Sequence, residues 1–234
     1  MFVTTSRSVR ETILRELPEI PSERFHIIPH GRNFSTFEQI HPTFKEAEPL
    51  RILIPGNISV AKGNDIIKML LEKDKEGKLE FHILGNTSLK DKHPRLTFHG
   101  NYLRDDFVNK VQQIQPHVGA IFSIWNETWC HTLTELWSVG IPAIVFSFPT
   151  VAGRVIESGG GWVYDHNDID QLYINIINEV SNVKILSEKR LAVVAWQQGE
   201  GKLNTTFKMS SRYQEVYRQA IDRQLSQARV LMAK

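Results

Sequence analysis

The sequence predicts an α/β fold, built on a doubly wound parallel sheet with helices at its C-terminal end. Short apolar runs alternate with longer amphipathic runs along most of the 234 residues, as repeated strand–helix–strand units require. The run LRILIPG, residues 50–56, is apolar at successive positions. Such continuity is typical of a strand that is buried on both faces of a parallel sheet.

Strands are expected where short apolar runs end in turn-forming residues, at 24–31, 50–56, 79–85, 95–100, 118–125, 141–147 and 159–165. Helices are expected where apolar residues recur at helical spacing, after the loop at 57–63 and at 104–115, 132–140, 151–158, 168–181 and 186–234. Gly140 is suited to end one of these helices in the left-handed conformation. Residues 34–49 contain two prolines and little periodicity, which predicts a linker.

Composition narrows the class of protein. Hydrophobic residues make up 41% and charged residues 23%, as in ordinary soluble domains. The net charge of +2 is too small to indicate a nucleic-acid partner. The single cysteine, Cys130, excludes an internal disulfide and suits a cytoplasmic protein. Basic residues of the tail allow peripheral contact with a membrane at its inner face, but interleaved Gln and Ser favour a solvated face: Arg212, Arg218, Arg223, Arg229 and Lys234.

Ligands of such sheets bind at the carboxyl ends of the strands, and the loop GNISVAKG, residues 56–63, lies at one of these ends. Backbone N–H groups at a helix N-terminus, together with Lys62, would suit an anion such as a diphosphate. The spacing is not that of a P-loop, and no G-x-G-x-x-G follows a strand. A strand–helix loop with a surface lysine is the alternative interpretation.

Two carboxylates follow the strong strand at 118–125. Glu127 lies on the loop after it, and Glu135 lies about one turn into a helix that starts near His131 or Thr132. One turn rises roughly 5 Å, so both side chains can face one cleft and accept hydroxyls of a sugar or ribose. The alternative is that each is a solvated helix-end charge. The histidines have no metal-ligand spacing and no G-x-S-x-G occurs, so neither a metal nor a cofactor is expected.

Taken in order, these segments resemble the C-terminal half of GT-B glycosyltransferases of the large retaining family 4. RFHIIPHGRNF resembles the family's entry to its C-terminal domain, and ILIPGNISVAKG is similar to its G-R-x-x-x-x-K-G loop. IWNETWCHTLTELWSVGIPAIVFS resembles its signature of two glutamates separated by seven residues. GGGWVYDHNDIDQLYINI resembles the run that follows the signature. The resemblance implies a Rossmann-like domain that binds a nucleotide-diphosphate sugar.

The resemblance also implies roles. Glu127 would contact hydroxyls of the donor sugar, Glu135 the ribose, and Lys62 the diphosphate, with no metal or cofactor. Further donor-binding residues would come from the signature helix, the Pro-x-Gly turn and two loops that hold the base: Asn57, Cys130, His131, Thr132, Leu133, Gly31, Arg32, Gly85, Asn86, Gly100 and Tyr102.

The sequence departs from the family at several of these positions. Asn57 stands where the family usually has arginine, which removes a charge and a bidentate fork from the phosphate clamp. Arg32 is a candidate to compensate. Thr128 and Cys130 replace two glycines of the signature loop, and His131 follows them.

The expected organisation has three parts. Residues 1–23 would be a strand–helix remnant of an N-terminal domain, 24–200 the nucleotide-sugar-binding domain, and 201–234 a helical tail. The family's N-terminal Rossmann domain, which supplies the acceptor site, would then lie in the same or another chain, and the acceptor would be a glycan or lipid-linked. The alternatives are an inactive nucleotide-sugar-binding module and a sugar-nucleotide epimerase of the same fold.

Overall fold

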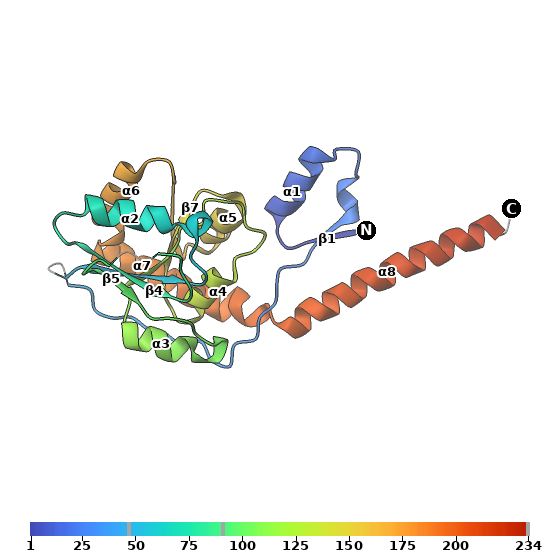
Figure 1. The fold of residues 1–234 in the computed structure, drawn as a ribbon. Helices are drawn as coiled ribbons and strands as arrows, with labels where there is room; N and C mark the ends of the chain where they lie inside the picture. Colours follow the sequence, from blue (N-terminus) through green and yellow to red (C-terminus); the bar gives the residue numbers. More distant parts are fainter. Residues whose placement is uncertain (46–47, 90–91, 233–234) are drawn as a thin grey trace. The chain divides into compact units, whose positions relative to one another are not determined.

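The computed structural model describes residues 1–45, 48–89 and 92–232, and from residue 227 onward only the helical backbone. The chain forms two compact units. The larger unit covers residues 34–201, and the smaller unit joins residues 1–33 to the segment that begins at Lys202. The larger unit contains the main sheet (Figure 1).

That sheet has six strands in the described part of the chain, and all neighbouring strands are parallel. Their order across the sheet is β5 (Leu96–Phe98), β4 (Leu79–Leu84), β3 (Leu50–Pro55), β6 (Val118–Ile121), β7 (Ala143–Phe146) and β8 (Gly161–Tyr164). β3 and β6 are neighbours at the centre although β4 and β5 separate them in sequence. The predicted doubly wound parallel sheet is confirmed.

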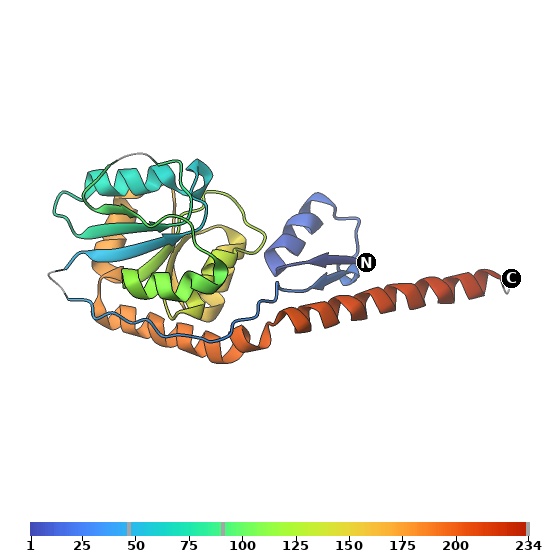
Figure 2. The same cartoon turned by 60° about the horizontal axis from the view of Figure 1, so that its bottom comes forward.

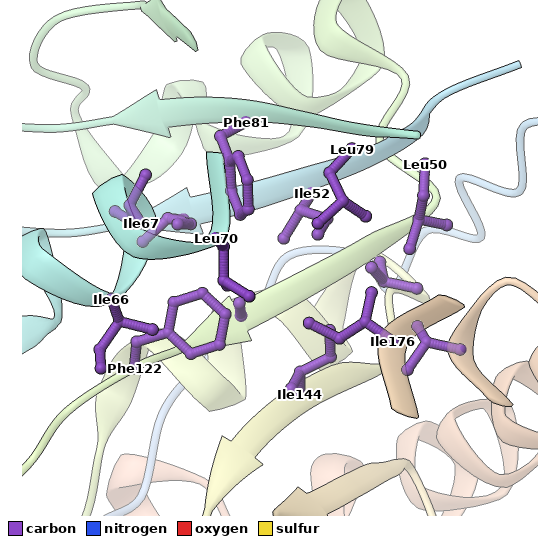
Figure 3. Close-up of a cluster of buried hydrophobic side chains, with 14 of the residues drawn as sticks. Leu50, Ile52, Ile66, Ile67, Leu70, Leu79, Phe81, Phe122, Ile144 and Ile176 are labelled. Carbon is purple, nitrogen blue, oxygen red and sulfur yellow. The ribbon is translucent and has the colours of Figure 1, made fainter. Parts of the chain in front are cut away.

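The continuous apolar runs of the strands supply two hydrophobic cores, one on each face of the sheet. In β3, Ile52 and Ile54 belong to one core and Leu53 to the other, because successive side chains of a strand point to opposite faces. Figure 3 shows the first core, where Ile52 and Phe81 of the sheet lie near Ile67 of a covering helix. Burial on both faces explains why these strands do not alternate apolar and polar residues.

Helices cover both faces, and Figures 1 and 2 show α2 and α3 on opposite sides of the sheet. The first core is covered by α2 (Asn64–Lys73), which follows the 3₁₀ turn η2 (Val60–Lys62), and by α6 (Ile169–Asn175) with its π-helical end η4 (Ile176–Val180). The second core is covered by α3 (Phe107–Ile114), α4 (His131–Ser138), α5 (Pro149–Ser158) and the later part of α7 (Val183–Trp196). The 3₁₀ turn η3 (Arg104–Asp106) precedes α3, and the π-helical turn η5 (Gln197–Gly201) continues α7.

The predicted linker is confirmed in its described residues, 34–45 and 48–49, which have no regular secondary structure. It is nevertheless packed within the larger unit, to which it belongs. The backbone N–H of Glu38 donates to the carbonyl of Ser138 at 2.9 Å, and Gln197 Nε2 donates to the carbonyl of Glu38 at 2.9 Å.

The smaller unit contains a two-stranded parallel sheet of β1 (Phe2–Thr4) and β2 (Phe25–Ile27), connected through α1 (Arg7–Glu16) and η1 (Ser22–Arg24). The long helix α8 (Thr206–Met232) belongs to the same unit. Arg212 of α8 donates to the carbonyl of Ile27 at 2.8 Å. The two ends of the chain therefore form one compact unit, which differs from the separate ranges 1–23 and 201–234 expected from the sequence.

Several elements are shorter than expected, such as the strand predicted over 24–31, which is Phe25–Ile27, and for two elements the structure shows the reason. The strand predicted over 118–125 ends at Ile121, because its last ladder partner is Val145 of β7 and the chain then leaves the sheet. The helical tail is interrupted at Asn204 and Thr205. The carbonyl of Asn204 accepts a hydrogen bond from the N–H of Arg32 at 2.8 Å. This carbonyl is therefore satisfied by a residue outside the helix. Lys234 lies outside the described residues.

Candidate functional site

The centre of the sheet is a topological switch point. β3 continues through α2 to β4 on one side, whereas its other neighbour, β6, continues through α4 to β7 on the opposite side. The helices that follow these two strands, α2 and α4, cover opposite faces of the sheet, and open α/β sheets bind ligands in the crevice at such a point. The loops after β3 and β6 are those that the sequence singles out, with Lys62 on the first and Glu127 on the second.

Backbone contacts hold the two loops together. The N–H of Ile124 donates to the carbonyl of Ala61 at 3.0 Å. Gly63 has φ +93°, and a Cβ atom at this position would collide with Phe122. Glycine is therefore required here both for its left-handed conformation and for the close approach of the second loop. This packing fixes Lys62 next to the end of β6.

Lys62 lies at the end of η2 and forms an ion pair with Glu127. Its Nζ also lies 5.2 Å from the ring centroid of Trp125, a cation–π geometry. Ser123 donates a second hydrogen bond to Glu127, at 2.6 Å. Burial raises the pKa of the Glu127 carboxyl, but the hydrogen bonds from Lys62 and Ser123 outweigh it and hold the pKa below its ordinary value. Glu127 is therefore an ionised acceptor.

The start of α4 lies beside this pair. Its N-cap, Cys130, is buried and has φ +73°, a conformation that strains any residue with a Cβ. Burial raises the pKa of the Cys130 thiol to about 11, so the thiol is neutral. A small pocket at the carboxyl ends of β3 and β6 is lined by both loops and by the first turn of α4, including Gly56, Asn57, Lys62, Ser123 and Thr132.

The second glutamate of the signature lies in α4 and has a different partner. The hydroxyl of Tyr102 donates to Glu135 Oε2 at 2.8 Å, and Glu135 is only 8% exposed. Tyr102 reaches it from the loop after β5, where Gly100 has φ +73°. Glu135 is thus a buried carboxylate whose Oε2 the hydroxyl of Tyr102 orients.

The loops after β3, β4 and β5 are joined by backbone hydrogen bonds. The N–H of Ile58 donates to the carbonyl of Asn86 at 2.7 Å, and the N–H of Gly85 donates to that of Gly100 at 2.8 Å. A Cβ atom on Gly85 would collide with the carbonyl of Gly56. These contacts fix the backbone conformation of the three loops at this edge of the sheet.

The structure therefore gathers most residues singled out from the sequence at one edge of the sheet. They come from the loops after β3, β4, β5 and β6 and from the first turns of α4: Asn57, Lys62, Gly85, Asn86, Gly100, Tyr102, Glu127, Cys130, His131, Thr132, Leu133 and Glu135. Gly31 and Arg32 belong instead to the smaller unit. Their binding roles, and compensation for Asn57 by Arg32, remain predictions.

Three contributors to this region were missed from the sequence. Ser123 contacts Glu127, and Trp125 contacts Lys62. Both residues follow an apolar run at the carboxyl end of a predicted strand, and this position could have indicated them as site residues. Arg154 lies on α5 and donates to the backbone that precedes α4. No local pattern indicates such a contact, because the two segments are distant in sequence.

Among the described residues, no three His, Cys, Asp or Glu side chains are grouped as a metal site. In residues 1–45, 48–89 and 92–232, no helix combines the length and apolar character needed to cross a membrane.

No family model and no curated protein matches this chain, but its fold matches that of GT-B glycosyltransferases. A mutant of TarM from S. aureus, solved with fondaparinux, alpha-GlcNAc-glycerol and UDP, is 14% identical and covers 92% of this chain with a TM-score of 0.68. HepE from Anabaena in complex with UDP-glucose is 13% identical and covers 93%, with a TM-score of 0.68. The lipopolysaccharide outer core galactosyltransferase WaaB, in its apo form, is 16% identical and covers 93%, with a TM-score of 0.69.

This chain spans only part of each of those structures: 43% of TarM, 63% of HepE and 61% of WaaB. The likeness concerns the fold.

Proposed function

We propose that this chain is the donor-binding part of a retaining, family 4-like glycosyltransferase of the hexosyltransferase type. It binds a nucleotide-diphosphate sugar in the crevice at the switch point. The glycosyl group is transferred to a glycan or lipid-linked acceptor, in cell-surface polysaccharide synthesis at the cytoplasmic side. TarM and HepE were solved with UDP or UDP-glucose, which supports the choice of ligand class.

The observation that carries the proposal is the arrangement around Lys62. Its ammonium group and the first turn of α4 line one pocket at the carboxyl edge of the sheet, and the ionised Glu127 is paired with that ammonium group. A cation and a helix N-terminus favour an anion there. The adjacent carboxylate favours hydroxyl groups. A sugar diphosphate offers both kinds of group at adjacent positions.

The same groups account for the chemistry. When the sugar–phosphate bond breaks, negative charge builds on the departing diphosphate. Lys62 and the positive end of α4 stabilise that charge where it develops. Lys62 exchanges Glu127 for the diphosphate, and Glu127 becomes available to the sugar hydroxyls. Glu135, which the hydroxyl of Tyr102 orients, accepts the ribose hydroxyls.

A thermal-shift screen with UDP-, GDP-, ADP- and dTDP-sugars tests the proposal. A ligand that binds only the folded protein adds about 2.7 kcal/mol to its stability when present at 100 times Kd. We expect the nucleotide sugars of one base to raise the melting temperature strongly. The nucleoside of that base, which has no phosphates, should have little effect. If none of the four classes raised the melting temperature, the proposal would be wrong.

Replacing Glu135 by glutamine is expected to weaken binding of the nucleoside diphosphate found in the screen by about tenfold. A hydrogen bond to a charged group contributes about 1.5–3 kcal/mol, and the amide retains the oxygen that Tyr102 contacts. The preference for a ribonucleotide over its 2′-deoxy counterpart should also decrease. Calorimetry with both nucleotides measures the two effects.

The matched control is Glu188→Gln, which removes an exposed carboxylate on α7. This control should leave both affinities unchanged. An unaltered ribose preference in Glu135→Gln would exclude the ribose role.

The partial coverage of TarM, HepE and WaaB supports a second candidate, in which the chain binds the donor but is inactive without an N-terminal Rossmann domain in the same or another chain. Hydrolysis or transfer of the donor sugar by the chain alone, measured as release of the nucleoside diphosphate, decides between the two. Release at an enzymatic rate would exclude the inactive module.

A further inference from the structure

The side chain of Arg154 hydrogen-bonds to the start of α4 and to the two residues before it. It projects from α5, is 9% exposed, and donates through Nη1 to the carbonyls of Trp129 and Cys130, each at 2.9 Å. Its Nη2 donates to Thr134 Oγ1 at 2.8 Å. One guanidinium thus connects the two residues before α4 with a side chain of its first turn.

No carboxylate of the described residues lies within ion-pair distance of Arg154, although the charges of Glu127, Glu157 and Glu200 act on its guanidinium from farther away. The polar partners of Arg154 are two carbonyls and a hydroxyl. Its Cζ lies 4.1 Å from the ring centroid of Trp129 and 5.4 Å from that of Trp137. Burial lowers the pKa of Arg154, but guanidinium groups in proteins stay protonated. A buried cation is costly unless charge of the opposite sign lies nearby.

The contacts of Arg154 also orient backbone dipoles. In a planar trans peptide the N–H points opposite to the C=O. Because the carbonyls of Trp129 and Cys130 point at Arg154, the N–H groups of Cys130 and His131 point away from it. Cys130 needs such support, since its left-handed conformation costs roughly 1–2 kcal/mol.

We infer that Arg154 is a positioning residue for the diphosphate of the donor, and that its charge offsets part of what is missing at Asn57. The inference rests on the proposed function and deepens it. The bound anion lies at the positive end of α4, in the pocket that Thr132 lines. There it is attracted by the helix dipole and by the buried cation behind it. In return, Arg154 keeps the strained turn in the conformation that receives the anion.

Inorganic pyrophosphate tests this role without reference to base or sugar. Arg154→Met preserves length and apolar packing but removes the charge and the fork, and should lower pyrophosphate affinity about tenfold by calorimetry. Arg154→Lys restores the charge without the fork and should give a loss of about threefold. The parent nucleoside of the nucleotide found in the screen should bind both variants as it binds the wild type.

The matched control is Arg190→Met, because Arg190 of α7 also donates to two backbone carbonyls, those of Pro42 and His117, but away from this pocket. It is expected to lower the melting temperature without changing pyrophosphate affinity.

The inference is overturned if Arg154→Met binds pyrophosphate like the wild type, if Arg190→Met loses as much affinity, or if nucleoside affinity falls in parallel. If Arg154→Met does not fold, Arg154→Lys decides: reduced affinity supports the role and wild-type affinity excludes it. Failure of wild-type protein to bind pyrophosphate also excludes it. The proposed function fails separately, when no nucleotide sugar shifts the melting temperature.

Discussion

Replacing Lys62 by alanine is expected to lower the turnover of the complete enzyme by about 10²–10³-fold, the effect of removing one group that stabilises developing charge. Lys62 is the cation that lines the pocket, together with Asn57 and Thr132. Its loss also leaves the ionised Glu127 facing an anionic ligand without its partner. Initial rates at saturating donor, together with calorimetry on the nucleoside diphosphate, measure the loss.

Lys184→Ala is the matched control, because it removes an exposed lysine of α7 from the same unit. Turnover and affinity should both remain at the wild-type level in this control. Lys62→Arg preserves the charge and should recover part of the rate. A wild-type rate in Lys62→Ala would refute the assignment of the diphosphate site, whatever the screen shows.

Replacing Asp74 by alanine is expected to lower the free energy of unfolding of the larger unit by about 3–5 kcal/mol, as when one partner of a buried ion pair is removed. Asp74 is 0% exposed and pairs with Arg95. It also accepts the N–H groups of Lys78 and Leu79, at 3.0 and 2.8 Å, and the hydroxyl of Tyr173 at 3.0 Å. Alanine would leave the buried N–H of Leu79, and the partly buried donors of Lys78 and Tyr173, without this acceptor.

Urea unfolding followed by tryptophan fluorescence measures this loss, because all 5 tryptophans lie within residues 34–201. Asp170→Asn is the control, since it breaks an exposed ion pair with Lys73 and should change stability little. Equal stability of Asp74→Ala and the wild type would contradict the prediction.

The same carboxylate makes stability depend on pH. Burial raises the pKa of Asp74, but the hydrogen bonds from Leu79, Lys78 and Tyr173 and the charge of Arg95 outweigh it, so the pKa lies below its ordinary value. A depressed pKa stabilises the fold fully above the unfolded pKa of about 4 and loses this contribution as pH falls through the folded pKa. Below pH 4, stability should therefore fall more steeply in the wild type than in Asp74→Asn.

The local pattern of the sequence was sufficient to predict the fold and to place the loops of the candidate site at one edge of the sheet. Continuous apolar runs such as residues 50–56 predict buried parallel strands, and such strands place the loops with Lys62 and Glu127 at one edge of a sheet. The start of α4 at His131 was also predicted from the sequence, within the uncertainty that remained between His131 and Thr132. These features depend on residues close together in the chain, where periodicity carries the information.

Tertiary structure alone decided which side chains meet. The pairing of Lys62 with Glu127, of Tyr102 with Glu135 and of Arg154 with the turn at Cys130 joins segments that are 65, 33 and 24 residues apart. Such contacts depend on strand order, register and helix packing, which no local pattern specifies. For the same reason the sequence overextended the strand at 118–125, whose ladder with β7 ends at the pair Ile121–Val145, and it treated the two ends of the chain as separate parts. Side-chain chemistry along the chain thus determined which groups lie at this edge of the sheet, and long-range packing determined how those groups are paired.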